Sequence, residues 1–260
     1  MSVVRNSSVR PVFTLILSTL VASMAQNSAN AELRLEGQLW AISVEGDGAV
    51  GDNGVPGTRL DLERDFGYTD DEIVFGGTVL WGDRHQLGAS YFQVDISAST
   101  QFDEPVKFDN LVFSPGIPVE SSLEATLLRA FYRYSAGSDA FRIGPIVGFH
   151  YFDISSRASS PQIGSASAEI RGPTPIVGAF LETTATDWLR FQLSGVGFTG
   201  GFDDVSASFY DVEAFVLVGW KSYFMAGGYR HVFIDGEDDS QPTDADITFK
   251  GPVGMIGFRW

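Results

Sequence analysis

The chain has 260 residues, of which 17 are Lys or Arg and 33 are Asp or Glu, so its formal net charge is −16. Such a surplus of negative charge argues against nucleic-acid binding, which depends on patches of Lys and Arg. The chain contains no cysteine, which excludes a disulfide framework and any chemistry by a thiolate.

The first 31 residues are typical of a secretory signal peptide. Arg5 and Arg10 give a basic leader, residues 12–25 are apolar apart from Ser and Thr, and residues 29–31 form a small-x-small cleavage site. The apolar run is shorter than the roughly 20 residues that a membrane-spanning helix needs. We therefore expect export through the general secretory route and a single mature domain of residues 32–260. No later stretch is long and apolar enough to predict a membrane-spanning helix.

Ten segments of the mature chain alternate apolar and polar residues with a period of two, which is typical of β-strands with two different faces. We predict strands at residues 32–45, 72–81, 85–97, 119–134, 140–154, 168–183, 188–199, 207–220, 223–234 and 247–260. The intervals alternate between short gaps and long gaps, and the long gaps are residues 46–71, 98–118, 155–167, 200–206 and 235–246. This layout predicts an all-β fold, a transmembrane antiparallel up-and-down barrel of about ten strands, with eight as the alternative.

One face of each predicted strand is apolar and the other carries the charges. In residues 207–220, Val212 and Val216 alternate with Asp211 and Glu213. An arginine on the lipid-facing side costs about 2–4 kcal/mol at the bilayer centre, so the charged face should line the lumen. The predicted lumen charge network consists of Arg129, Arg133, Arg142, Arg190, Arg230, Glu36, Glu182, Asp211 and Glu213.

Aromatic residues gather beside the short gaps. The predicted girdle consists of Trp81, Tyr132, Tyr134, Trp188, Trp220 and Tyr223. Amphipathic rings favour the headgroup level of a membrane. A soluble β-sandwich is the alternative, but it would pack its aromatic residues inward and would not sort tryptophans to one set of turns.

The chain ends in the alternating residues Ile256, Phe258 and Trp260. With the short turns and the girdle, this ending resembles bacterial outer-membrane β-barrel proteins of a small, uncharacterised family, and the resemblance covers residues 32–260. It implies an outer membrane of the Gram-negative type, termini in the periplasm, and an assembly signal at Phe258 and Trp260 for the barrel-assembly machinery. Most members of the class end in Phe, so Trp260 is a departure.

A barrel of about ten strands is only slightly wider than the eight-stranded barrels that side chains fill, so its buried charges must pair. A narrow or closed, salt-bridged lumen favours an envelope-structural or interaction role. The alternative is a low-conductance small-solute channel lined by arginine. Acidic residues at 61–72 and 235–246 predict acidic outer loops that contact lipopolysaccharide through divalent cations, but their spacing does not match a 12-residue calcium loop.

Enzymatic readings find less support. Ten-stranded outer-membrane proteases of the omptin type place Asp and His at the outer rim. The residues of this chain that could lie at that rim are Asp70, Asp71, His231 and Asp235. However, Asp70 and Asp71 are adjacent, and adjacent residues of a strand point in opposite directions. Lipid A deacylase barrels use a Ser–His arrangement, and no serine lies two residues after His150. A rim enzyme acting on peptide or lipid is therefore the second alternative. We expect no catalytic residue, metal site or cofactor, and we expect the apolar residues within 98–118 to pack over the barrel mouth.

Overall fold

The computed structural model describes residues 31–51, 55–69, 71–202, 205–220, 222–238 and 243–260. The predicted signal peptide therefore lies outside the described residues except for Ala31, and so do Asp70 and Asp239 of the acidic segments. Within the described parts of the chain, no helix has the length and apolar character needed to cross a membrane.

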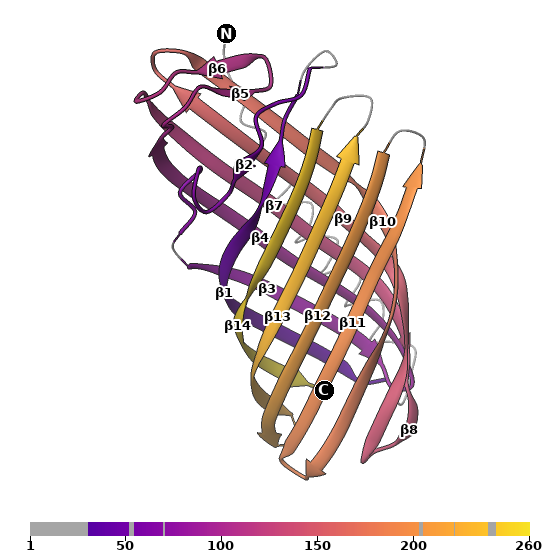
Figure 1. Cartoon of the computed structure of the whole chain (residues 1–260). Coiled ribbons are helices and arrows are strands. Elements are labelled where there is room, and N and C mark those ends of the chain that lie inside the picture. Colours follow the sequence, from indigo (N-terminus) through magenta and orange to yellow (C-terminus); the bar gives the residue numbers. More distant parts are fainter. Residues whose placement is uncertain (1–30, 52–54, 70, 203–204, 221, 239–242) are drawn as a thin grey trace, which may run out of the picture.

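Ten long antiparallel strands form a closed wall in the described chain (Figure 1). They are β1 (Leu33–Ala49), β3 (Glu72–Gly82), β4 (His85–Gln101), β7 (Pro118–Tyr134), β9 (Phe141–Ser160), β10 (Gly164–Thr186), β11 (Leu189–Phe202), β12 (Val205–Trp220), β13 (Tyr223–Asp238) and β14 (Thr243–Arg259). Each pairs with the next along the chain, and β14 pairs with β1 to close the ring. The predicted ten-stranded barrel is confirmed, and the eight-stranded alternative is wrong.

Four short strands accompany the wall. They are β2 (Leu60–Asp61), which pairs with β1, β8 (Ala136–Ser138), which pairs with β9, and β5 (Val106–Phe108) with β6 (Leu111–Phe113), which form a separate hairpin. The β5–β6 hairpin lies at the top of Figure 1, at the end opposite the short turns.

Three predicted long loops are largely strand. Residues 155–167 belong almost entirely to β9 and β10, whose pairing continues to Ser160 and Gly164, and most of 200–206 and 235–246 is also strand. The prediction failed because the outward residues of these segments are polar, as Ser155 and Arg157 are on β9. The apolar alternation that marks a lipid-facing strand ends there, although the backbone pairing does not.

The polarity of the two faces of the wall reverses along the strands. Over residues 141–151 of β9 the outward side chains are apolar and exposed; beyond them the outward residues are polar and the inward ones, such as Phe152 and Ile154, are buried. The change falls at one register on four neighbouring strands. The last apolar outward row is Tyr91, Leu128, Tyr151 and Pro173, and the first polar row is Gln93, Thr126, Asp153 and Arg171.

This exchange marks the edge of the hydrophobic zone. Eleven residues at about 3.3 Å each extend about 36 Å along a strand, or about 28 Å after a tilt of ~40°, which is close to an apolar band of about 25 Å. The half of the barrel with short turns therefore has the polarity of a membrane wall. The other half has the polarity of a water-soluble barrel, with an apolar interior.

Aromatic side chains fill that second half. Phe66 lies at the centre of this apolar plug, which comprises Phe66, Tyr68, Phe102, Phe108 and Phe113, all buried. Its ring centroid lies 5.9 Å from Tyr68, 6.4 Å from Phe102 and 6.1 Å from Phe108. Residues 60–68 thus enter the barrel, and the buried residues from 98–118 pack at its mouth as the sequence predicted.

A compact turn holds Phe66 in place. The Asp61 amide donates to Asp65 Oδ2 at 2.8 Å, and the Arg64 amide donates to Asp61 Oδ1 at 2.7 Å. Gly67 follows with a φ of 81°, a region open to glycine. The Ser121 hydroxyl of β7 donates to the Phe66 carbonyl at 3.1 Å, which ties the turn to the wall.

Candidate functional site in the lumen

Four charged side chains meet in the middle of the barrel. Asp211 and Glu213 of β12 share the inward face because residues two apart in a strand point the same way. Arg230 of β13 donates to both oxygens of Asp211, at 3.0 Å from Nε and 2.8 Å from Nη2. Arg129 of β7 donates to Asp211 at 3.3 Å and to Glu213 at 3.2 Å. We call these four residues the central cluster.

The central cluster is almost dry. Its members are 0–8% exposed, and Ser194 donates a further hydrogen bond of 3.2 Å to Glu213. The Arg230 guanidinium carbon lies 4.2 Å from the Phe92 ring centroid and 5.0 Å from that of Trp40. These hydrogen bonds offset part of the hydration that the buried ions lose, and the aromatic faces add cation–π attraction. Among the described residues, Arg129 Nε and Arg230 Nη1 have no hydrogen-bond partner.

Side chains fill the barrel at this level. On the plug side of the central cluster, Trp40, Ile42 and Phe249 are completely buried. On the other side, the cavity between the cluster and the short-turn end has a volume of only about 30 Å³, room for about one water molecule. Among the described residues, the centre of the lumen is therefore closed by packing and by ion pairs.

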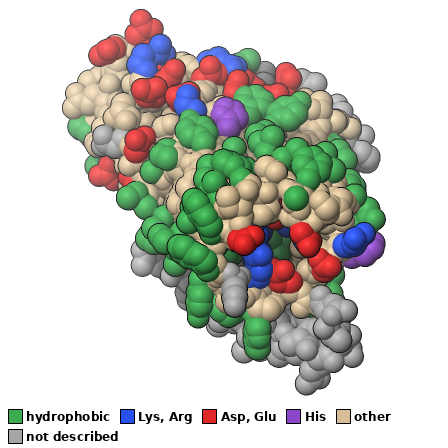
Figure 2. Space-filling model, turned by 90° about the horizontal axis from the view of Figure 1, so that it is seen from below, with side chains coloured by type: hydrophobic (Ala, Val, Ile, Leu, Met, Phe, Trp, Pro, Cys, Tyr) green, Lys and Arg blue, Asp and Glu red, His purple; other side chains and the backbone are tan. Residues whose placement is uncertain are grey.

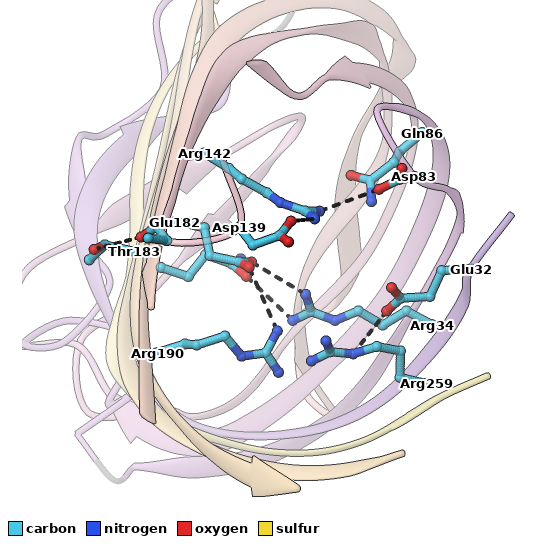
Figure 3. Close-up of polar contacts among 12 residues, drawn as sticks. Glu32, Arg34, Asp83, Gln86, Asp139, Arg142, Glu182, Thr183, Arg190 and Arg259 are labelled. Atoms are coloured by element: carbon cyan, nitrogen blue, oxygen red, sulfur yellow. Dashed lines mark hydrogen bonds and ion pairs between the residues drawn. The ribbon is translucent and has the colours of Figure 1, made fainter. Parts of the chain in front are cut away.

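A second group of charges lines the short-turn end, around a cavity of about 380 Å³ that we call the vestibule (Figure 3). Glu182 lies between Arg34 and Arg190, at 3.7 Å and 3.6 Å. The other ion pairs here are Arg34–Glu36 at 2.5 Å, Arg142–Asp139 at 3.0 Å, Arg142–Asp83 at 3.6 Å and Arg259–Glu32 at 2.8 Å. Figure 2 shows this end from below, with charged side chains around a hollow and hydrophobic side chains outside.

The structure thus divides the predicted lumen network into two groups. Arg129, Arg230, Asp211 and Glu213 form the central cluster, whereas Glu36, Arg142, Glu182 and Arg190 pair around the vestibule. Arg142 lies at the opening, with 30% of its side chain exposed. Arg133 faces the vestibule without a carboxylate partner among the described residues.

Sequence reasoning missed the aromatic supports of the central cluster. Trp40 and Phe92 lie at inward-facing positions of the alternating pattern of their strands, and this alternation could have identified them. It also missed Gln86, which accepts a hydrogen bond from Arg133, and Glu32, which precedes β1 and pairs with Arg259.

The predicted girdle residues lie near the short turns and the chain end. Trp188, Trp220 and Tyr223 are 45–72% exposed, and Trp81, Tyr132 and Tyr134 are partly exposed. Trp260 exchanges two backbone hydrogen bonds with Leu33, at 2.8 Å and 2.9 Å, and its ring is exposed. The Phe258 ring packs 5.2 Å from Tyr223.

His150 and His231, the two histidines of the enzymatic readings, lie on opposite faces of the barrel wall. His150 is buried inside the barrel beside Phe152 and Phe209, whereas His231 faces outward on β13 and His85 follows the β3–β4 turn. His231 lies opposite Val212 and Lys250 in the strand register rather than at the barrel opening. In the described part of the chain, no group of three or more His, Asp or Glu side chains could hold a metal ion.

No family model and no curated protein matches the chain. Among solved structures, the outer membrane protease OmpT of Escherichia coli is 13% identical, with 90% of this chain and 99% of that chain covered and a TM-score of 0.51. The transport unit of the Escherichia coli autotransporter AIDA-I is 10% identical, with 98% of each chain covered and a TM-score of 0.42.

The Pseudomonas putida toluene transporter TodX is 9% identical, with 92% of this chain and 91% of that chain covered and a TM-score of 0.33. Identities this low concern the fold alone. The closed ten-strand barrel and the likeness to the OmpT structure give this chain the fold of bacterial outer-membrane β-barrel proteins.

Proposed function

We propose that this protein resides in a Gram-negative-type outer membrane as a barrel with a closed lumen, in an envelope-structural or interaction role. The central cluster carries this proposal. A conducting barrel needs a hydrated path, whereas here Arg129 reaches across the lumen to Asp211 and Glu213 at the bottom of an apolar interior. Breaking such a buried pair would leave charges unpaired, at a cost of about 3–5 kcal/mol.

The two ends of the barrel support a direction for it in the membrane. The short turns and the Phe258–Trp260 ending face the periplasm, where the ending is read by the barrel-assembly machinery. The polar half then projects from the cell as a rigid extension of the wall. Asp95 and Glu124 stand opposite each other on its outer surface, directly beyond the apolar band. Like charges at this level would be bridged by divalent cations to the phosphates of lipopolysaccharide.

Planar-bilayer recording of refolded protein tests the closed lumen. Wild-type protein is expected to insert and give no conductance steps, because the centre of the barrel holds neither a hydrated path nor an unpaired charge. Insertion is verified separately by protease protection and by the heat-dependent mobility shift of folded barrels on gels. Reproducible steps in the wild type would overturn the proposal.

The vestibule favours a second candidate, a low-conductance channel for small solutes. Five arginines line the 380 Å³ cavity, which reaches into the barrel from the periplasmic end. Rings of arginine select anions in pores. Anion-selective steps that disappear in Arg129→Gln, but persist in the outward-facing control Arg157→Gln, would assign this function instead. The likeness to a protease assigns no catalytic residue to this chain.

A further inference from the structure

Arg133 is a buried lumen arginine that forms no ion pair within 4 Å among the described residues. It lies near the end of β7, is 6% exposed, and lines the vestibule. Among the described residues, no carboxylate oxygen lies within 4 Å of its guanidinium. A buried charge without a partner is costly, so its persistence needs a reason.

The neighbours of Arg133 hold its side chain without neutralising it. Nε donates to the Gln86 side-chain oxygen, and the guanidinium carbon lies 4.3 Å from the centroid of the Phe180 ring. The hydrogen bond fixes the plane of the guanidinium, and the ring covers one side of it. No described residue accepts a hydrogen bond from Nη1 or Nη2, which together form a planar fork suited to a carboxylate or phosphate group.

The other charges of the vestibule are already matched. Each of its remaining arginines has a carboxylate within 4 Å, in the pairs Arg34–Glu36, Arg142–Asp139, Arg190–Glu182 and Arg259–Glu32. Asp187, a further acidic lining residue, is exposed at the β10–β11 turn. Among the described lining residues, the arginine without an ion pair is therefore buried in the cavity, whereas the carboxylate without an ion pair, that of Asp187, is exposed at the turn.

We propose that the vestibule binds a small periplasmic molecule through an oxyanion group, phosphate or carboxylate, which the fork of Arg133 holds. The cavity of about 380 Å³ falls within the range of about 300–1,000 Å³ found for small-molecule sites, so the organic part of the ligand has room beside the anion. The next cavity toward the central cluster, which Arg133 also lines, has a volume of only about 30 Å³. The vestibule is therefore closed at its inner end and is not the entrance to a pore.

The test titrates refolded protein in detergent micelles at low ionic strength with inorganic phosphate and, separately, with acetate. Binding is followed by calorimetry and by the arginine Nε–H signals in NMR spectra. We expect saturable binding that shifts the Arg133 signal and weakens at least about tenfold in Arg133→Gln, with an intermediate loss in Arg133→Lys because lysine keeps the charge but not the fork. The control Arg157→Gln, on the outer wall of β9, should bind as the wild type does.

Phosphate binding alone would assign a phosphorylated ligand, and acetate binding alone a carboxylate-bearing one. If Arg133→Gln fails to refold, Gln86→Ala replaces it, because losing the hydrogen bond to Nε frees the guanidinium plane and should weaken binding. Binding of neither anion by the wild type, or equal binding by a folded Arg133→Gln, would overturn the site. The result does not depend on whether the lumen conducts, so it is separable from the bilayer recording.

Discussion

Arg230 lies opposite Glu213 in the register of β12 and β13, yet its side chain bonds to Asp211, the diagonal neighbour. Glu213 is thereby left for Arg129, which comes from β7 across the lumen. Because Arg230 bonds to Asp211 and not to Glu213, the four charged residues form one connected network. The bonds of Arg129 join β7 to β12, which are not neighbours in the sheet, so the cluster braces the barrel against opening at its centre.

Removing the shared acceptor should be costly. Asp211→Asn would leave Arg230 and part of Arg129 without a counter-charge in a dry site, and we expect the free energy of unfolding to fall by about 3–5 kcal/mol. The control Asp95→Asn changes an exposed residue and should alter it by less than about 0.5 kcal/mol. Urea unfolding in detergent measures both, and equal midpoints would contradict the bracing role.

Reversing the second carboxylate tests the inward assignment of β12. Glu213→Lys would place a third cation beside Arg129 and Arg230 and should cost several kcal/mol, with loss of the folded band on unheated gels. Glu124→Lys is the matched control, because it reverses an outward charge opposite Asp95 and should be neutral or slightly stabilising. A folded band of normal intensity for Glu213→Lys would show that its side chain reaches solvent.

The apolar plug should depend on Phe66. Phe66→Ala removes the ring that contacts Tyr68, Phe102 and Phe108, at an expected cost of about 3–5 kcal/mol. The loss should be concentrated in the outer half and appear as faster proteolysis within residues 55–69. Val112→Ala, at an exposed position of β6, should leave the cleavage rate unchanged. Identical rates for the two variants would contradict the buried position of Phe66.

The turn that carries Phe66 should loosen in acid. The Arg64 guanidinium beside Asp65 holds the pKa of that carboxyl below its usual range, and the Asp61 amide adds to the effect. A depressed folded-state pKa contributes stability that is present above the unfolded value of about 3.9 and is lost as the pH falls through the folded pKa. NMR titration of the Asp65 carboxyl carbon should give a midpoint below ~3.9 that rises in Arg64→Gln. A midpoint at the usual value in the wild type would show that the interaction of Arg64 with Asp65 does not stabilise the turn.

The wall of the barrel was predictable because lipid imposes a strict period of two. Asp211, Glu213 and Arg230 could be assigned to the lumen from parity alone, since an outward charge in the membrane is penalised. Parity does not specify which inward charges meet. That Arg230 bonds to Asp211 depends on strand register and tilt, which bring together residues far apart in the chain.

The outer half was harder to predict for a related reason. Water solvates Ser155 or Arg157 as readily in a loop as on the outer face of a strand. The outer part of β9 therefore shows no alternation of apolar and polar residues that would identify it as strand. The entry of Phe66 into the barrel likewise depends on hydrogen bonds made by the side chains of Asp61 and Asp65 within the turn and of Ser121 on β7, not on a periodic pattern.

Hydrocarbon must surround the half of the barrel with short turns if this half spans a membrane. Nitroxide labels on single cysteines test it directly in lipid bilayers, because the chain contains no cysteine of its own. A label at Ala130, outward in the apolar band of β7, should be accessible to oxygen and shielded from a water-soluble nickel chelate. A label at Ser97, beyond the polarity change on β4, should show the reverse; access of the chelate to Ala130 in a folded barrel would contradict the account.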